Sequence, residues 1–282
     1  MGTGRKRNTG IEIFRIAAIL IVICSHTELN YFDGEFNPYR LVLACIFGDS
    51  VAFFFMIAGF FFFQKGFRVQ AKKVVLQIIV PAAVVMLLSQ VFHEWLFHRQ
   101  SLIKDLTSFQ IDWYRISSNL LAGKTGMELC PHMWYVFAYA GCVLWLPLMG
   151  FICKEEPYCR KVRRCLILLN LAAVLVEGIQ KLYILPAGAI TTFTLIPNSL
   201  AHMLIGYEIY QNRQRIAGNK KLRYVALAVF IGMNVVRWFA QYALYLREPT
   251  DDYYIYWNTI FGFVCGTSMT IVFMSIQWKE FR

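Results

Sequence analysis

Three ionisable side chains lie in an apolar segment near the start of the sequence, IEIFRIAAILIVICSHTE (residues 11–28): Glu12, Arg15 and His26. An ionisable residue at the centre of a membrane span costs about 2.5–3.5 kcal/mol on insertion scales, so each needs a reason. In a helix, eleven residues place Arg15 and His26 within about 20° of one face and about 16 Å apart along the axis. Glu12 can pair with Arg15 one turn later.

The two chemistries suit different parts of one reaction. A guanidinium group is a permanently charged, planar fork that binds phosphate, and an imidazole can move a proton to or from a hydroxyl. A plainer interpretation is also open. Glu12 and Arg15 would then form an ion pair that extends to the membrane interface, and His26 would bond to a neighbouring helix. The spacing alone does not choose between them.

Further pocket candidates lie in later apolar segments. The second segment reads GDSVAFFFMIAGFFFF and contains Phe55 and Gly59. Gly59 would let either a ligand or another helix approach closely. The fourth segment opens with CPHMWYVFAY, which contains His132, Trp134 and Tyr135. Trp and Tyr are also common at the membrane–water interface, so a pocket is one of two explanations for them.

Arg237, in NVVRWFAQY, lies near the middle of its predicted span and should face a polar cavity or a carboxylate. We expect Glu177 to be its partner by depth, although Glu177 can also pair with Lys181 one turn later. For His202, in NSLAHMLIGYE, we expect a hydrogen bond to a neighbouring helix.

The composition indicates an integral membrane protein. Of the 282 residues, 58% are hydrophobic and only 16% are charged, with a mean hydropathy of +0.49. Soluble domains are less apolar and carry more charge. The apolar runs are about twenty residues long, as helices that cross a bilayer require, whereas barrel strands need only about ten. We therefore predict an all-α, polytopic helical bundle with about eight transmembrane helices, at residues 11–30, 41–63, 74–97, 132–153, 165–182, 188–210, 223–246 and 255–278.

The formal net charge of +11 comes from Lys and Arg in short loops between these spans. Most of them fall in the loops on the side of the N-terminus, which predicts that both termini are cytoplasmic and that His26 points outward. We interpret the basic residues as determinants of orientation and predict no nucleic-acid partner. The eight cysteines form no CxxC pair, so we predict neither a metal site nor a disulfide framework.

Three motifs resemble those of the membrane acyltransferase-3 family. Glu12-x-x-Arg15, followed by ten residues and then His26, is similar to the signature of that family's first helix. FFFMIAGFFFF (residues 53–63) resembles its second helix, and HMWYVFAYAGCVLWLPLM (residues 132–149) resembles its later His/Leu-Trp-Tyr/Phe helix. Their order and separations agree, and the resemblance extends over the whole chain.

The resemblance implies transfer of an acyl group, often acetyl, from a cytoplasmic acyl-CoA to a hydroxyl of a cell-envelope glycan or small metabolite. The protein would lie in a bacterial-type cell membrane. By the same resemblance, Arg15, with Glu12, would bind the acyl-CoA donor. His26 would be catalytic, either as a general base or as a transient carrier of the acyl group.

Two departures from the family pattern are visible. Ala58 stands where relatives usually have Ser, and relatives usually have about ten spans, whereas this sequence ends at KEFR after eight. We therefore expect a single domain, residues 1–282, that lacks the last two helices. One alternative is a transporter-like domain for a solute such as D-serine, because the family also resembles the membrane portion of serine racemases linked to vancomycin resistance. A purely structural membrane protein is a third possibility.

Overall fold

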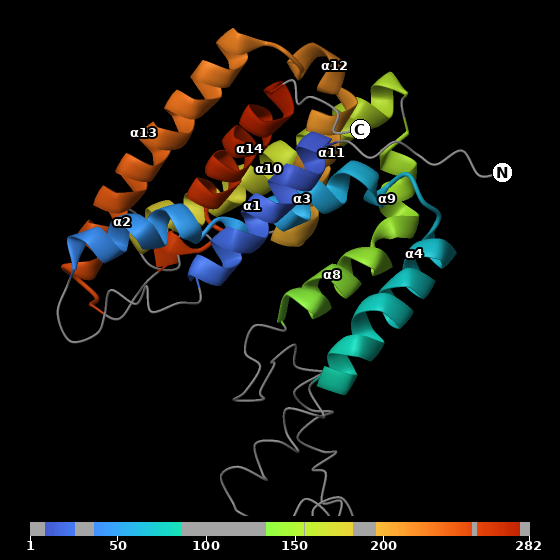
Figure 1. The fold of residues 1–282 in the computed structure, drawn as a ribbon, viewed down its shortest axis with the longest axis horizontal. Coiled ribbons are helices and arrows are strands. Elements are labelled where there is room, and N and C mark those ends of the chain that lie inside the picture. The colour runs from blue at the N-terminus through green and yellow to red at the C-terminus, as the bar shows by residue number, and fades with distance from the viewer. Residues whose placement is uncertain are drawn as a thin grey trace, which may run out of the picture. The chain divides into compact units, whose positions relative to one another are not determined.

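The computed structural model describes residues 9–25, 37–85, 134–154, 156–182, 196–249 and 253–276. All regular structure in these residues is helical (Figure 1). The helices are α1 (Thr9–Ser25), α2 (Pro38–Phe47), α3 (Ser50–Phe62), α4 (Phe67–Val74), the π-helix η1 (Val75–Ile79), α8 (Trp134–Leu144), α9 (Leu146–Ile152), α10 (Pro157–Lys181), α11 (Asn198–Gln211), α12 (Arg213–Ile216), α13 (Lys220–Tyr245), the 3₁₀-helix η3 (Tyr253–Ile255) and α14 (Ile260–Ser275).

The chain divides into two compact units. The first comprises residues 1–64 and 151–282, and the second comprises residues 65–150. In the second unit, α4 packs against α8. The first unit holds most of the described helices.

Three helical stretches are long and apolar enough to cross a membrane: Pro38–Phe62, Lys220–Tyr245 and Tyr253–Ser275. They coincide with the predicted spans at 41–63, 223–246 and 255–278. Helices also occupy the described parts of the other five predicted spans. Only 11% of the most apolar window of α13 is buried in the protein, so most of this helix presents apolar side chains outward, as a lipid-facing helix does.

The prediction of unbroken helices is wrong in three of these spans. The span predicted at 132–153 breaks at Trp145, between α8 and α9, and two further breaks lie in the first unit. The span predicted at 41–63 breaks at Gly48 and Asp49, between α2 and α3. The span predicted at 255–278 begins with η3 and a non-helical turn, and its α-helix starts only at Ile260. Both breaks leave backbone carbonyls without an intrahelical partner. Such breaks are tolerated at membrane depth where protein groups bond to them.

The helix α10 begins at Pro157, before the start of the fifth predicted span at residue 165. Its first turns carry basic residues that we assigned to a loop. One of them, Arg163, is buried and pairs with Glu208 of α11. Arg163 also donates to the carbonyl of Ile152 at 3.0 Å. These bonds join α10, α11 and the end of α9 within the first unit.

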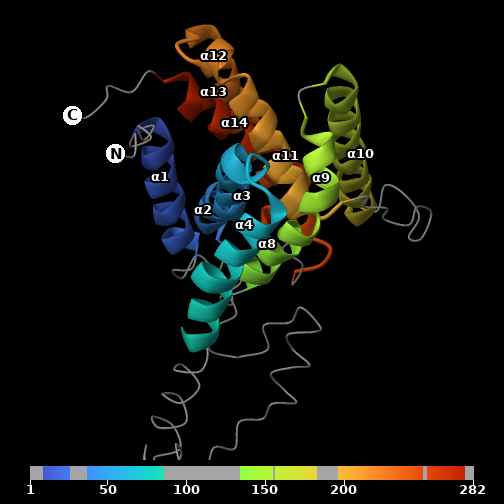
Figure 2. The ribbon, with the colours of Figure 1, turned by 90° about the vertical axis from the view of Figure 1, so that its right-hand side faces the viewer.

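The core of the first unit is the contact between α3 and α11, which lie side by side (Figures 1 and 2). A Cβ atom on Gly59 would lie 2.0 Å from the carbonyl oxygen of Met203, and one on Gly206 would lie 2.1 Å from that of Met56. The two backbones therefore touch through reciprocal glycines, as small residues allow in membrane helices.

The aromatic contacts give the direction of these helices. Near their N-terminal ends, Phe55 of α3 and His202 of α11 both contact the ring of Trp257, which precedes α14. Near their C-terminal ends, Phe60 stacks on Tyr210 with the ring centroids 5.4 Å apart. The helices α3 and α11 therefore run in the same direction.

Candidate functional site

The helix α1 carries Arg15 beside its buried face. Ile11, Phe14 and Ala18 recur at helical spacing and pack against α3. Arg15 lies next to this stripe with 41% of its side chain exposed, and its Nη1 donates to Glu12 Oε1 at 2.9 Å. The structure therefore forms the Glu12–Arg15 pair that the three-residue spacing predicts.

Most of the Arg15 guanidinium remains available. The group has five N–H donors, and the bond to Glu12 uses one of them. Within the described ranges, the other four donate to no protein atom. A half-exposed arginine with unused donors can bind an anionic oxygen of a ligand. His26 follows Ser25, the last residue of α1, and lies outside the described residues, so its position on the face of Arg15 stays a prediction.

The aromatic candidates are placed as follows. Phe55 is buried, and its ring centroid lies 5.3 Å from that of Trp257. The backbone of Met203 fills the space beside Gly59, which prevents a ligand from approaching on that side. Tyr135 is half exposed on α8 in the second unit. Trp134 begins that helix, and His132 lies outside the described residues.

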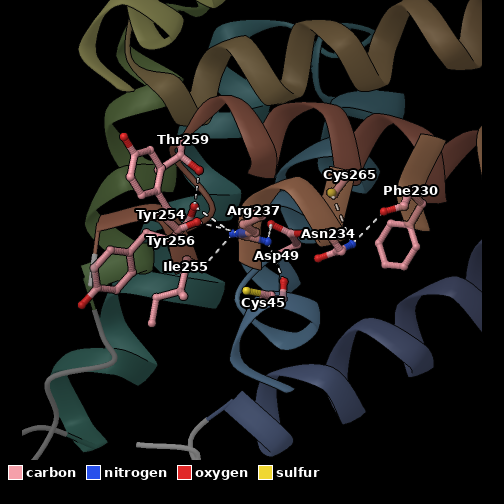
Figure 3. A network of polar contacts seen from close by, with 10 residues as sticks. All are labelled: Cys45, Asp49, Phe230, Asn234, Arg237, Tyr254, Ile255, Tyr256, Thr259 and Cys265. Atoms are coloured by element: carbon pink, nitrogen blue, oxygen red, sulfur yellow. Dashed lines mark hydrogen bonds and ion pairs between the residues drawn. The ribbon is translucent and has the colours of Figure 1, made fainter. Parts of the chain in front are cut away.

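Arg237 is the centre of a buried polar network between the broken helices (Figure 3). Its Nε donates to the carbonyl of Tyr254 at 2.6 Å, and its Nη2 donates to Ile255 at 2.8 Å and Tyr256 at 3.2 Å. Its Nη1 donates to the carbonyl of Cys45 at 2.6 Å and lies 2.9 Å from Asp49 Oδ1. The guanidinium therefore makes four hydrogen bonds to backbone carbonyls and one ion pair with the Asp49 carboxylate.

The structure corrects the partner that we expected for Arg237. The carboxylate is that of Asp49, at the α2–α3 break, and not that of Glu177 on α10. Arg237 and Asp49 are both fully buried, which is tolerable because the charges are paired. Since the guanidinium of Arg237 is engaged by four carbonyls and the Asp49 carboxylate, the geometry supports a structural role for this residue rather than ligand binding.

Gly48 explains how the two breaks can meet. A Cβ atom at this position would lie 1.9 Å from the carbonyl oxygen of Ile255. Only a glycine lets the turn before α14 approach the α2–α3 break this closely. The approach brings the free carbonyl groups of both breaks within reach of one guanidinium.

His202 makes a different bond from the one we expected. Its Nδ1 lies 2.7 Å from the carbonyl oxygen of Asn198, on its own helix. Its contacts with other elements are through the ring, which stacks on Phe263 and lies beside Trp257. The expected hydrogen bond to a neighbouring helix is therefore wrong.

The comparisons with known proteins are consistent with the motifs of α1 and α3. A model of the acyltransferase-3 family, described as "Acyltransferase domain", matches residues 8–281. No curated protein and no solved structure matches the chain. The family match covers nearly the whole sequence, and the apolar helices suit a bilayer. The chain therefore belongs to the acyltransferase-3 family and is a membrane acyltransferase.

Proposed function

We propose that the protein transfers an acyl group, most simply acetyl, from a cytoplasmic acyl-CoA to a hydroxyl of a cell-envelope glycan or small metabolite. Arg15 binds phosphate oxygens of the donor, and Glu12 orients its guanidinium. His26 receives the proton of the acceptor hydroxyl. The family match supports the reaction class. The exposed pair on α1 supports Arg15 and Glu12 as the donor site, and the first-helix motif supports His26 as the base.

In the proposed step, the hydroxyl oxygen attacks the carbonyl carbon of the thioester while the imidazole of His26 takes the hydroxyl proton. The tetrahedral intermediate then collapses, and the bond between carbon and sulfur breaks. The imidazolium returns the proton to the departing thiolate, which leaves as the free thiol of CoA. The products are an ester and a thiol, so the step needs no oxidant or reductant.

The observation that carries this proposal is the contrast between two arginines. Arg237 is fully buried, and its guanidinium is engaged by four carbonyls and the Asp49 carboxylate. Arg15 is half exposed, and one donor is used by Glu12. Of these two arginines, only Arg15 can therefore form the bidentate contact with phosphate that a guanidinium makes well.

The test is transfer of label from radiolabelled acetyl-CoA by the purified full chain in lipid nanodiscs, with a total envelope extract as acceptor. We expect His26→Ala to lower the rate by about 100-fold or more, as loss of an acid–base group does. Arg15→Ala should also lower the rate of transfer when the concentration of acetyl-CoA is limiting. Arg215→Ala, an exposed arginine on α12, is the matched control and should leave the rate unchanged.

The same preparations distinguish the enzyme from a transporter. If reconstituted vesicles accumulated D-serine while no labelled ester formed, the transporter-like alternative would replace the proposal. If His26→Ala and Arg15→Ala both transferred label at the normal rate, the assignment of these residues would be wrong even though the reaction class stands.

A further inference from the structure

A polar cluster lies at the start of α11, where this helix meets α10 and the turn before α14. Its side chains are Asn170, Asn198 and His202, and Asn170 and His202 are fully buried. The Nδ2 of Asn170 donates to Asn198 Oδ1 at 3.0 Å, and the Nδ2 of Asn198 donates to the carbonyl of Asn258 at 3.3 Å. We call these residues the α11 cluster.

The contacts of His202 define which nitrogen is free. A carbonyl oxygen can only accept, so the 2.7 Å contact with Asn198 requires that Nδ1 of His202 carry the proton. The Nε2 of the neutral imidazole is then an acceptor. Neither this atom nor Asn170 Oδ1 has a hydrogen-bond partner among the described residues. The α11 cluster therefore presents two unpaired, buried acceptors.

Packing holds the imidazole in place. The ring of Phe263 stacks on it with the centroids 3.8 Å apart, and the ring of Trp257 lies beside it at 5.3 Å. The glycine contact between α3 and α11 fixes the helix that carries His202. The ring therefore cannot turn towards another partner. An unpaired buried acceptor destabilises a fold, and a bound molecule that donates a hydrogen bond to it would remove this cost.

The chemistry of the α11 cluster limits what can bind there. A ligand must offer an O–H or N–H group to the two acceptors, and the aromatic rings give the cluster an apolar wall. No side chain of the cluster is a carboxylate, so a buried cation would have no counter-charge. Asn258 is exposed, and Trp257 and Asn198 are partly exposed, which places the cluster directly beneath the surface.

We propose that His202 and Asn170 bind a neutral hydroxyl compound. The identification of this compound as the acceptor substrate, whose hydroxyl receives the acyl group, rests on the proposed function. His202 is then a residue that positions the acceptor, and its role is separate from the proton transfer assigned to His26.

The first test compares the stability of variants in nanodiscs without any added ligand. His202→Phe keeps a planar ring and removes the unpaired acceptor, so its melting temperature should equal or exceed that of the wild type. A lower melting temperature would show that Nε2 already has a partner in the resting protein, such as a buried water, and would overturn the proposal. Asn234→Leu is the matched control, since Asn234 Oδ1 is also buried without a partner but lies outside the cluster.

The second test measures binding directly, with glucose, rhamnose, N-acetylglucosamine and glycerol as probes and no acetyl-CoA present. At least one probe should raise the melting temperature of the wild type and of Asn234→Leu. Its apparent dissociation constant should rise about tenfold in His202→Phe, as loss of one good hydrogen bond predicts. Stabilisation by ammonium chloride instead, equal stabilisation of His202→Phe, or no stabilisation by any probe would contradict the proposal.

These readouts separate the two proposals. Binding that depends on His202, with no transfer of label, would support the α11 cluster as a site and contradict the proposed reaction. Normal label transfer by His202→Phe, with an unchanged KM for the acceptor, would contradict the α11 cluster and leave the reaction intact.

Discussion

Arg237 Nη1 lies 2.9 Å from Asp49 Oδ1, and neither side chain is exposed. The pair stands where two interrupted helices meet, and the same guanidinium also bonds to carbonyls on both sides of that junction. The arginine therefore connects α13 to the α2–α3 break and to the turn before α14. This turn carries Trp257, which contacts both Phe55 and His202.

Replacing the arginine should be strongly destabilising. Arg237→Met would leave the buried Asp49 carboxylate without its counter-charge and four backbone carbonyls without their donor. Breaking a buried ion pair costs about 3–5 kcal/mol, and the orphaned carbonyls should place the loss at the upper end of that range or above it. The free energy of unfolding in detergent measures this effect.

Asp49→Asn should be milder than Arg237→Met. It removes the charge of the partner but keeps an oxygen near Nη1, and Arg237 retains its four carbonyl acceptors. We expect a loss of about 1–3 kcal/mol. If Asp49→Asn proved as damaging as Arg237→Met, the carbonyl contacts would contribute less than the geometry indicates.

The reciprocal glycines of α3 and α11 give a further prediction. Gly59→Ala and Gly206→Ala should each destabilise the protein by about 1–3 kcal/mol, because the new methyl group would overlap the partner backbone and force the helices apart. Gly232→Ala on α13 is the control. Its Cβ would meet nothing within 4 Å, so this change should be neutral or stabilising by up to about 1 kcal/mol. Equal effects at all three positions would contradict the proposed contact.

Much of the architecture follows from the sequence, because long apolar runs can satisfy their backbone in lipid only as helices. The three helical stretches that are long and apolar enough to cross a membrane coincide with predicted spans. The Glu12–Arg15 pair was also predictable, since a three-residue spacing on one helix needs no knowledge of the tertiary fold.

The partner of Arg237 could not be inferred in this way. Asp49 and Arg237 are 188 residues apart, and only the packed structure brings them together. The available signal was the GDS sequence within an otherwise apolar run, where a glycine and an aspartate both disfavour a continuous helix. Depth in the membrane alone points to Glu177, but this depth does not tell which faces of two helices meet.

Two adjacent arginines on α10 give another prediction. Arg163 is buried against Glu208, whereas the side chain of Arg164 is 57% exposed and lies 3.6 Å from the same carboxylate. Arg163→Gln should lower the free energy of unfolding by about 3–5 kcal/mol, because it removes the buried counter-charge of Glu208 and the charged donor to the carbonyl of Ile152. Arg164→Gln should change it by less than about 1 kcal/mol. Similar losses in the two variants would show that the buried pair contributes no more than the exposed one.

The most direct test of the central claim, that Arg15 binds the phosphates of the donor, compares two donors. Acetyl-CoA carries phosphates, and acetylpantetheine has the same thioester without them. The measurement is the ratio of kcat/KM for acetyl-CoA to that for acetylpantetheine, in the wild type and in Arg15→Ala. The account predicts that this ratio falls by about 10-fold to 100-fold in the variant, as expected for the loss of charged hydrogen bonds. An unchanged ratio would contradict it, even if both rates fell.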